Sequence, residues 1–256
     1  MFTRLLSALP GQCLVCQAWP ASALCAACVQ RFAAAVPRCQ TCALPVPEGV
    51  TRCGACLRQP PPLHACLAAV SYAWPWTSLI AQWKFTQTPG LAAPLGQLLA
   101  AAPGVAHAVA STDLVLPVPL SAQRLAERGY NPAQWLARAL APGKLRIGVL
   151  QRTRHTLPQH DLPRAQRLKN VRDAFALAPS AAALLHHRRV VLIDDVMTTG
   201  ATLHAAALPL LAAGAAQVTG IVLARAEPAG MPAPSQSLPC STSSLSSPKS
   251  PPTPAT

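Results

Sequence analysis

The sequence Val-Val-Leu-Ile-Asp-Asp-Val-Met-Thr-Thr-Gly-Ala-Thr, at residues 190–202, decides the fold of this 256-residue chain. Residues 190–193 form a short, mostly β-branched apolar run, which is typical of a strand buried on both faces of a parallel sheet. Two adjacent carboxylates, Asp194 and Asp195, follow this run, and a turn of hydroxyl residues and glycine comes next. We therefore expect a strand that ends in a polar loop, with a helix beginning at Ala201.

The expected loop has the composition of an anion-binding site. Gly200 allows a positive φ or a close approach of the backbone to a ligand. The first amides of the following helix lack intrahelical partners and lie at the positive end of its dipole. Asp194 and Asp195 repel phosphate but accept hydrogen bonds from neutral hydroxyls, so the segment predicts a site for a ribose 5-phosphate. The predicted phosphate-binding residues are Thr198, Thr199, Gly200, Ala201 and Thr202.

Residues 190–202 closely resemble the phosphoribosyl-pyrophosphate motif of the type I phosphoribosyltransferases. The resemblance implies that Asp194 and Asp195 are catalytic residues that hold the ribose hydroxyls, while the Thr-Thr-Gly loop holds the 5-phosphate. A buried strand with an acidic helix cap is an alternative, but a cap needs only one Asp or Thr. A Walker B strand is another, but the sequence contains no Gly-x-x-x-x-Gly-Lys-Ser/Thr motif.

Eight cysteines near the N-terminus have the spacing of zinc ligands. They form four Cys-x-x-Cys pairs, which is enough for two zinc ions held by four thiolates each. We expect a structural role, because four thiolates leave no open position for water. Disulfides and a redox motif are the alternatives, but nothing indicates export, and redox pairs occur singly beside a βαβ unit. Sequential and interleaved pairing both fit the spacing of Cys13, Cys16, Cys25, Cys28, Cys39, Cys42, Cys53 and Cys56.

Strand and helix patterns alternate along the rest of the chain. This alternation predicts an α/β fold, a doubly wound parallel sheet of the type I phosphoribosyltransferase kind, with its ligand at the carboxyl ends of the strands. We expect strands at 65–72, 113–120, 190–193 and 218–224, and helices at 76–85, 90–102 and 125–140. The expected organisation is a double zinc-ribbon module at 1–62, a phosphoribosyltransferase-like domain at 63–227 and a disordered Pro/Ser-rich tail at 228–256.

The net charge of +13 favours an anionic substrate, a nucleic acid, or both. Basic residues gather in the segment 152–172, which makes a nucleic-acid-binding protein an alternative hypothesis. The two longest apolar stretches contain prolines, glycines or a charge, so we expect no membrane span. The N-terminus lacks the features of a signal peptide, and we expect a cytoplasmic protein.

The chain also resembles the ComF family as a whole. The resemblance rests on the zinc-ribbon N-terminus and covers roughly residues 13–226. Further matching motifs are Trp-Lys-Phe at 83–85, Pro-Val-Pro-Leu at 117–120, Arg124, Arg-Gly-Tyr-Asn at 128–131, Arg-Thr-Arg at 152–154, Gln159, and Arg167 with Asn170.

The ComF resemblance implies a role in the use or uptake of DNA by bacteria. It also implies a magnesium-dependent phosphoribosyltransferase, with Arg124 and Arg128 against the pyrophosphate of phosphoribosyl pyrophosphate and Mg²⁺ bridging pyrophosphate and ribose hydroxyls. The acceptor is not identified by the sequence. Single-stranded DNA or proteins of the competence machinery are the expected partners. A non-catalytic module that binds a phosphoribosyl group or nucleic acid is the alternative.

Three features outside the motifs have competing interpretations. Lys84 meets a phosphate or neutralises a helix C-terminus. Trp74, Trp76 and Trp83 fit a core or domain-interface role better than base stacking. Cys66 is expected to be a small core residue.

Overall fold

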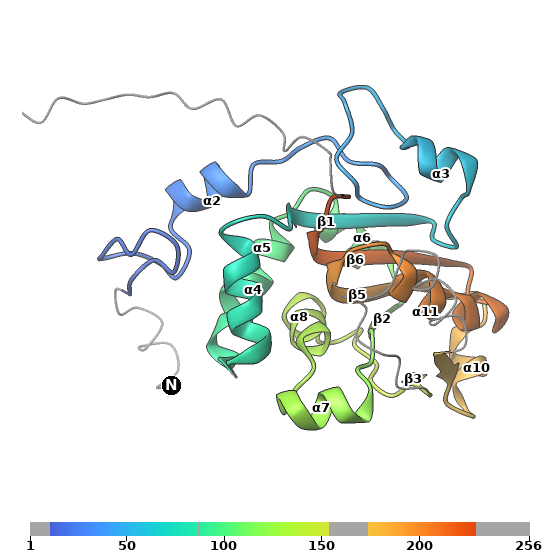
Figure 1. Cartoon of the computed structure of the whole chain (residues 1–256). Coiled ribbons are helices and arrows are strands. Elements are labelled where there is room, and N and C mark those ends of the chain that lie inside the picture. Colours follow the sequence, from blue (N-terminus) through green and yellow to red (C-terminus); the bar gives the residue numbers. More distant parts are fainter. Residues whose placement is uncertain (1–10, 87, 154–173, 229–256) are drawn as a thin grey trace, which may run out of the picture.

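The computed structural model describes residues 11–86, 88–153 and 174–228 (Figure 1). Most of the basic segment, including Gln159, Arg167 and Asn170, lies outside the described residues, as does the expected tail from 229 onward. Among the described residues, no single helix is long and apolar enough to cross a membrane. One pair, 89–100 with 105–111, meets the length and composition criteria only jointly and is bent by 90°.

A four-stranded parallel sheet forms the centre of the molecule, with strand order β1-β6-β5-β2. The two central strands, β5 and β6, are almost entirely buried, as their apolar sequences require. Ile193 of β5 pairs with Ile221 of β6, and Leu192 pairs with Leu116 of β2. The strands are β1 (Ala65–Ser71), β2 (Leu114–Pro117), β5 (Arg189–Met197) and β6 (Gln217–Arg225).

Helices cover both faces of this sheet, and a separate hydrophobic core lies between the sheet and the helices on each face (Figure 1). On one face lie α4 (Trp76–Phe85), α5 (Ala92–Ala100) and α8 (Pro132–Leu140), while α11 (Ala201–Ala212) lies on the other. The shorter helices are η1 (Pro89–Leu91), α6 (Val105–Ser111), α7 (Ala122–Arg128) and α10 (Ala181–Leu185). The expected doubly wound α/β fold is therefore confirmed.

Most of the sequence assignments for single elements hold, but the expected helix at 125–140 is wrong. The chain instead makes α7 and α8, because Gly129 ends α7 with a φ of +75°. The Asn131 side chain then accepts a hydrogen bond from the Ala133 amide at 3.0 Å, and Pro132 is the first residue of α8. As a result, Leu125 and Trp135 are exposed rather than part of the core.

Strand β5 continues beyond the apolar run that predicts it. Its last residues pair with β6 as far as Met197, so Asp194 and Asp195 lie within the strand and not after it. A further pair of short antiparallel strands, β3 (Leu150–Arg152) and β4 (Phe175–Leu177), was not expected from the sequence. These two strands flank the basic segment on either side.

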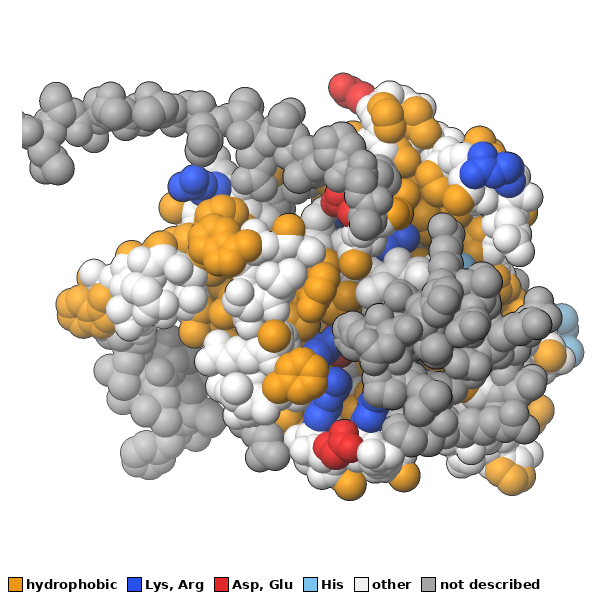
Figure 2. Space-filling model, in the orientation of Figure 1, with side chains coloured by type: hydrophobic (Ala, Val, Ile, Leu, Met, Phe, Trp, Pro, Cys, Tyr) orange, Lys and Arg blue, Asp and Glu red, His pale blue; other side chains and the backbone are white. Residues whose placement is uncertain are grey.

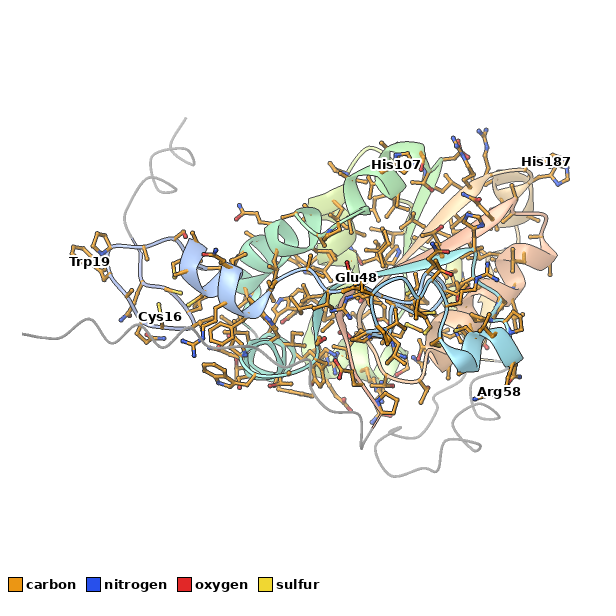
Figure 3. The ribbon with its side chains drawn as sticks, turned by 90° about the horizontal axis from the view of Figure 1, so that it is seen from above. Cys16, Trp19, Glu48, Arg58, His107 and His187 are labelled. Carbon is orange, nitrogen blue, oxygen red and sulfur yellow. The ribbon has the colours of Figure 1, made fainter. Side chains whose placement is uncertain are left out.

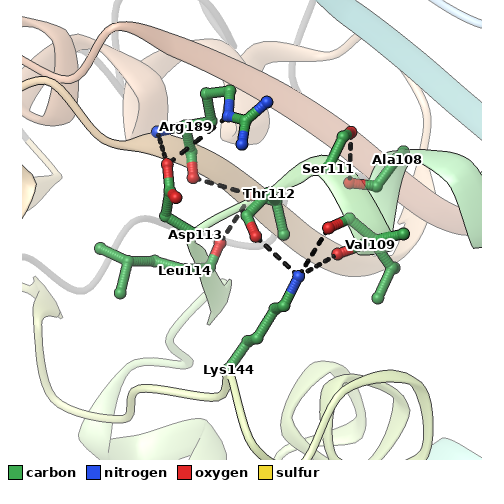
Figure 4. A network of polar contacts seen from close by, with 9 residues as sticks. Ala108, Val109, Ser111, Thr112, Asp113, Leu114, Lys144 and Arg189 are labelled. Carbon is green, nitrogen blue, oxygen red and sulfur yellow. Dashed lines mark hydrogen bonds and ion pairs between the residues drawn. The ribbon is translucent and has the colours of Figure 1, made fainter.

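A polar network fixes the end of the sheet opposite the acidic pair (Figure 4). Lys144 donates to the carbonyls of Val109, Ala110 and Thr112, each at 2.8 Å, and so neutralises the C-terminus of α6. The Asp113 carboxylate accepts the Arg189 amide at 2.8 Å, which ties the start of β2 to the start of β5. This anchoring sets the register that brings the other ends of these strands together.

The N-terminal region contributes two short helices, α2 (Ala26–Phe32) and α3 (Gly54–Arg58). Figure 3 shows Cys16 and Trp19 at one end of the molecule, with Arg58 toward the other. The Phe32 carbonyl accepts the Trp76 indole N–H at 2.7 Å, and the Phe32 ring meets Trp74 edge-on at 4.9 Å. Trp76 and Trp83 are buried as expected, whereas Trp74 is 63% exposed.

Candidate functional site

The two acids of the motif point to opposite faces of β5. Side chains alternate along a strand, and Ile193 faces the core beneath α4, α5 and α8, whereas Leu192 faces the core beneath α11. By this alternation Asp195 belongs to the α4 side and Asp194 to the α11 side. From the sequence, both carboxylates are expected to have the same role, but in the sheet each has a different environment.

Asp195 is held by a cation from a distant part of the chain. Lys84 at the end of α4 places its Nζ 2.7 Å from Asp195 Oδ1, and both side chains are largely buried, with 15% and 11% exposed. The Tyr130 hydroxyl donates to the Trp83 carbonyl and so holds the end of α4 that carries the lysine. Lys84 therefore neutralises Asp195, and neither of the two roles expected for it from the sequence describes this contact.

Asp194 is partly buried and lacks such a direct ion pair among the described residues. Burial, followed by the neighbouring charge of Asp195, raises the pKa of Asp194 to about 7. The charges of Lys84 and Arg152 oppose this rise without cancelling it. A carboxyl group with a pKa near neutrality changes its charge under physiological conditions.

The loop that follows β5 has the shape of an anion-binding turn. Gly200 has a φ of +85°, and a Cβ there would lie 2.5 Å from Met197 Cε, so only glycine fits. The Thr199 hydroxyl accepts the Ala201 amide at 3.3 Å, and α11 begins at Ala201. Thr198 is exposed and Thr199 and Thr202 are partly exposed, whereas Gly200 and Ala201 are buried.

His204 lies directly behind this loop, one turn into α11. Its Nε2 would be 2.8 Å from a Cβ at Gly200, and that atom is buried without a hydrogen-bond partner among the described residues. Burial, and then the charge of Arg225, lowers the pKa of His204 to about 4. His204 is therefore a neutral side chain at neutral pH. The sequence offered no signal for it apart from its position in the helix after the motif.

Basic side chains from α7 and β3 lie near the acids. Burial lowers the pKa of Arg152 and the charge of Arg124 lowers it further, whereas Asp194 raises it. The Arg128 guanidinium lies over the Phe85 ring, 5.2 Å from its centroid. Figure 2 shows Lys and Arg side chains gathered between α4 and α7 on this face. Arg124 and Arg128 are thus in the same part of the molecule as the motif, and their contact with a pyrophosphate stays a prediction.

The eight N-terminal cysteines form two clusters with sequential pairing. In each cluster all four sulfur atoms lie within 4.8 Å of one another. Cys16 and Cys25 sulfurs are 3.7 Å apart, as are those of Cys42 and Cys53. Tetrahedral zinc with bonds of about 2.3 Å requires sulfur separations of about 3.8 Å, whereas a disulfide requires about 2.05 Å. The clusters are Cys13, Cys16, Cys25 and Cys28, and Cys39, Cys42, Cys53 and Cys56.

One cysteine in each cluster, Cys13 or Cys39, has a lowered thiol pKa, which favours the thiolate that binds zinc. Burial raises the pKa of Cys28, Cys42 and Cys56 instead. Burial acts to raise the pKa of Cys13 and of Cys39, but hydrogen bonds outweigh it and lower each to about 6. Backbone amides do most of this at Cys13, whereas the Thr41 side chain and then backbone amides do so at Cys39. The Cys53 amide, for example, donates to Cys39 Sγ at 3.3 Å. All nine cysteines in the described part of the chain are free, and Cys66 is a buried core residue as expected. The residues therefore fit two structural Zn²⁺ ions.

The fold and the site define a class of protein, and comparison with known proteins agrees with it. Residues 125–238 match the phosphoribosyl transferase domain, and residues 5–57 match the double zinc ribbon domain. The chain therefore combines a phosphoribosyltransferase-type α/β domain with an N-terminal zinc ribbon.

Full-length relatives then identify the family. The DNA utilization protein YhgH of Salmonella typhimurium is 34% identical over 224 residues, which cover 82% of this chain and 95% of the relative. Competence protein F of Haemophilus influenzae is 33% identical over 210 residues, 79% of this chain and 90% of the relative. The chain belongs to the ComF family.

A solved structure of the allosteric regulatory enzyme of purine biosynthesis is more distantly similar. It has 20% identity and a TM-score of 0.36, covering 56% of this chain and 29% of that one.

Proposed function

We propose that this protein binds phosphoribosyl pyrophosphate together with Mg²⁺ and transfers its phosphoribosyl group to an acceptor. The observation that carries the proposal is the arrangement around the end of β5, where Asp194 lies in the last four residues of the strand and the Gly200 turn follows and opens α11. A ribose 5-phosphate has hydroxyls for the carboxylate and a phosphate for the turn, so one ligand of this class can use both parts of the site.

The residues divide the task by their chemistry. The turn at Thr198–Thr202 would hold the 5-phosphate through backbone amides and hydroxyls, and Asp194 would accept hydrogen bonds from the ribose hydroxyls. Mg²⁺ prefers oxygen ligands and supplies charge neutralisation for the pyrophosphate when bound. Arg124 and Arg128 on α7 would add further positive charge there. Asp195 is occupied by Lys84, so its part is to keep the strand end and α4 in place.

Transfer requires that the sugar be held still while the bond at its anomeric carbon breaks. Positive charge develops on the ribose as the pyrophosphate leaves, and the carboxylate of Asp194 would stabilise it. The acceptor would form a new bond to the anomeric carbon as the bond from that carbon to the pyrophosphate oxygen breaks, and the pyrophosphate would leave with the bonding electrons. Bound Mg²⁺ would supply positive charge for the pyrophosphate.

Calorimetric titration with phosphoribosyl pyrophosphate and Mg²⁺ tests binding. The wild-type chain should bind, and the double variant Asp194→Asn with Asp195→Asn should not. Unchanged affinity in the double variant would remove the proposed site. A pyrophosphate-release assay across purine and pyrimidine bases then tests turnover. Binding without release for any acceptor would favour the alternative of a non-catalytic phosphoribosyl-binding module.

We further propose that the protein acts in the use of DNA, as the names DNA utilization protein and competence protein suggest for its relatives, and that it does so in the cytoplasm. The net charge of +13 supports contact with single-stranded DNA or with proteins that carry it. Affinity for a single-stranded oligonucleotide should fall steeply with salt, and charge reversal within 152–172 should weaken it. If neither salt nor charge reversal changed the affinity for the oligonucleotide, the DNA proposal would be contradicted, whereas the proposal of a phosphoribosyl site would not be affected.

A further inference from the structure

Arg225, the last residue of β6, lies between the second cysteine cluster and the phosphate turn. It is only 5% exposed, although arginine is rarely buried without partners. Its Nε donates to the Cys42 carbonyl at 2.7 Å. Its Nη1 donates to the Met197 carbonyl at 3.2 Å, and also to the carbonyls of Thr198 and Ala226. One side chain therefore joins a zinc-ligand residue to the first residues of the turn.

The contacts with the turn determine where its amides point. A peptide group is planar and trans, so its N–H is directed opposite to its C=O. When Arg225 holds the Thr198 carbonyl, the amide of Thr199 is directed away from the arginine. The Met197 carbonyl fixes the amide of Thr198 in the same way, and it also accepts the Ala226 amide at 2.9 Å. Arg225 thereby orients two of the donors that an anion would use.

The second cysteine cluster is built into the same core as the turn. Cys39, Cys42 and Cys56 pack in one hydrophobic cluster with Met197 and Ala201, beneath α11. Cys66 Sγ lies 3.5 Å from Met197 Sδ, and the Cys66 amide donates to the ribbon's Gln40 carbonyl at 2.7 Å. The first cluster differs, because its neighbours such as Leu14 and Val29 pack against the core on the opposite face of the sheet.

We propose that Arg225 is a positioning residue through which the second zinc cluster holds the phosphate turn in its binding conformation. Among the described residues, four backbone carbonyls and no carboxylate satisfy the buried charge of the arginine. Loss of any one of these hydrogen bonds therefore leaves the buried guanidinium less well satisfied and weakens its hold on the other carbonyls. Displacement of Cys42 after zinc loss would leave the Arg225 Nε without its carbonyl partner and so loosen the orientation in which the guanidinium holds the turn. The inference rests on the proposed phosphoribosyl site and predicts that only the second zinc ion affects it.

The substitution Arg225→Lys tests this role in the full-length chain. Lysine keeps the charge but cannot bridge the Cys42 and Thr198 carbonyls as the planar guanidinium does. Hydrogen exchange of the ligand-free protein should accelerate in peptides that cover 198–202, with the zinc content unchanged. Affinity for ribose 5-phosphate should fall by about tenfold, the scale on which loss of a supporting contact to a binding group acts.

Arg38→Lys is the matched control. Arg38 is a partly buried arginine next to the second cysteine cluster. It donates to the Ala43 carbonyl at 3.0 Å and to Ser71 Oγ at 3.3 Å, and neither acceptor belongs to the turn. It should leave exchange at 198–202 and ribose 5-phosphate affinity unchanged. Cys42→Ser is the complementary variant, in which loss of about one zinc should be accompanied by faster exchange at 198–202.

Two results would overturn the positioning role. One is unchanged exchange at 198–202 in Arg225→Lys. The other is acceleration spread over the whole chain to the same degree in Arg225→Lys and Arg38→Lys, which would mean a loss of general stability. If the wild-type chain binds neither phosphoribosyl pyrophosphate nor ribose 5-phosphate, the proposed function fails, and the exchange comparison still decides the role of Arg225. A Cys42→Ser variant that does not fold leaves the decision to Arg225→Lys, which retains all zinc ligands.

Discussion

The charge of Asp194 should determine how tightly the protein holds a phosphoribosyl ligand. Burial and the neighbouring Asp195 raise the pKa of Asp194 to about 7 in the free protein. The ribose hydroxyls donate hydrogen bonds, so they favour the ionised carboxylate over the protonated one. Binding must therefore release a proton wherever Asp194 is still protonated, and affinity must rise with pH through neutrality.

The size of this effect follows from the pKa. With a pKa of about 7, roughly one tenth of the Asp194 side chains are ionised at about pH 6 and roughly nine tenths at about pH 8. If only the ionised form binds, affinity for phosphoribosyl pyrophosphate should be about tenfold higher at the upper pH. Close to one proton should be released per ligand bound at about pH 6, and close to none at about pH 8.

Isothermal titration calorimetry in two buffers of different ionisation enthalpy measures both the affinity and the proton count. The ligand's own phosphates titrate near pH 6, so Asp194→Asn is the necessary control, because asparagine does not titrate. The variant should bind weakly, with only the pH dependence of the ligand itself. Equal proton release in the wild type and the variant would refute the reasoning, as would wild-type affinity that is flat between these pH values.

Three further predictions concern stability and metal content. Asp194→Asn should raise the Tm most at about pH 8 and less at about pH 5. Unfolded aspartate ionises near 3.9 and the folded side chain only near 7, so the wild-type folded state loses stability progressively as pH rises between these values. A variant that is less stable than the wild type at both pH values would contradict this. Lys84→Met should lower the free energy of unfolding by about 3 kcal/mol in a denaturant titration, because it leaves the Asp195 carboxylate buried without its partner. Adding Asp195→Asn should recover most of this loss. An unchanged free energy of unfolding in Lys84→Met would contradict the prediction and show that solvent already satisfies Asp195. Metal analysis should find about two zinc ions per chain, and Cys13→Ser should retain about one, with its ribbon partly unfolded and ribose 5-phosphate affinity little changed; a folded protein without zinc would refute the zinc assignment.

Much of the site could be predicted because its signals are local in the chain. The apolar run before Asp194, the glycine that must adopt a positive φ and the helix that follows are set by residues within one short segment. The break between α7 and α8 was equally local, since Gly129 and Asn131-Pro132 are the usual signals for the end of one helix and the start of another. That error came from giving the apolar spacing of 125–140 more weight than these signals.

Other parts of the site depend on contacts between distant residues and had no local signal. Lys84 and Asp195 are 111 positions apart, and Cys42 and Arg225 are 183 apart. Their pairing follows from the strand order β1-β6-β5-β2, which places the end of β6 beside the end of β5. The opposite directions of Asp194 and Asp195 likewise depend on which helices cover each face of the sheet.

By itself, the amino-acid sequence determined the class of fold, the ligands for two zinc ions and the turn suited to a sugar phosphate. Each of these follows from backbone geometry or from ligand spacing within a few residues. Only the tertiary structure decided how the cysteines group, which acid keeps a titratable charge and which arginine joins the second ribbon to the turn. Those properties come from burial and from contacts across the chain, and burial exists only once the strands and helices have packed.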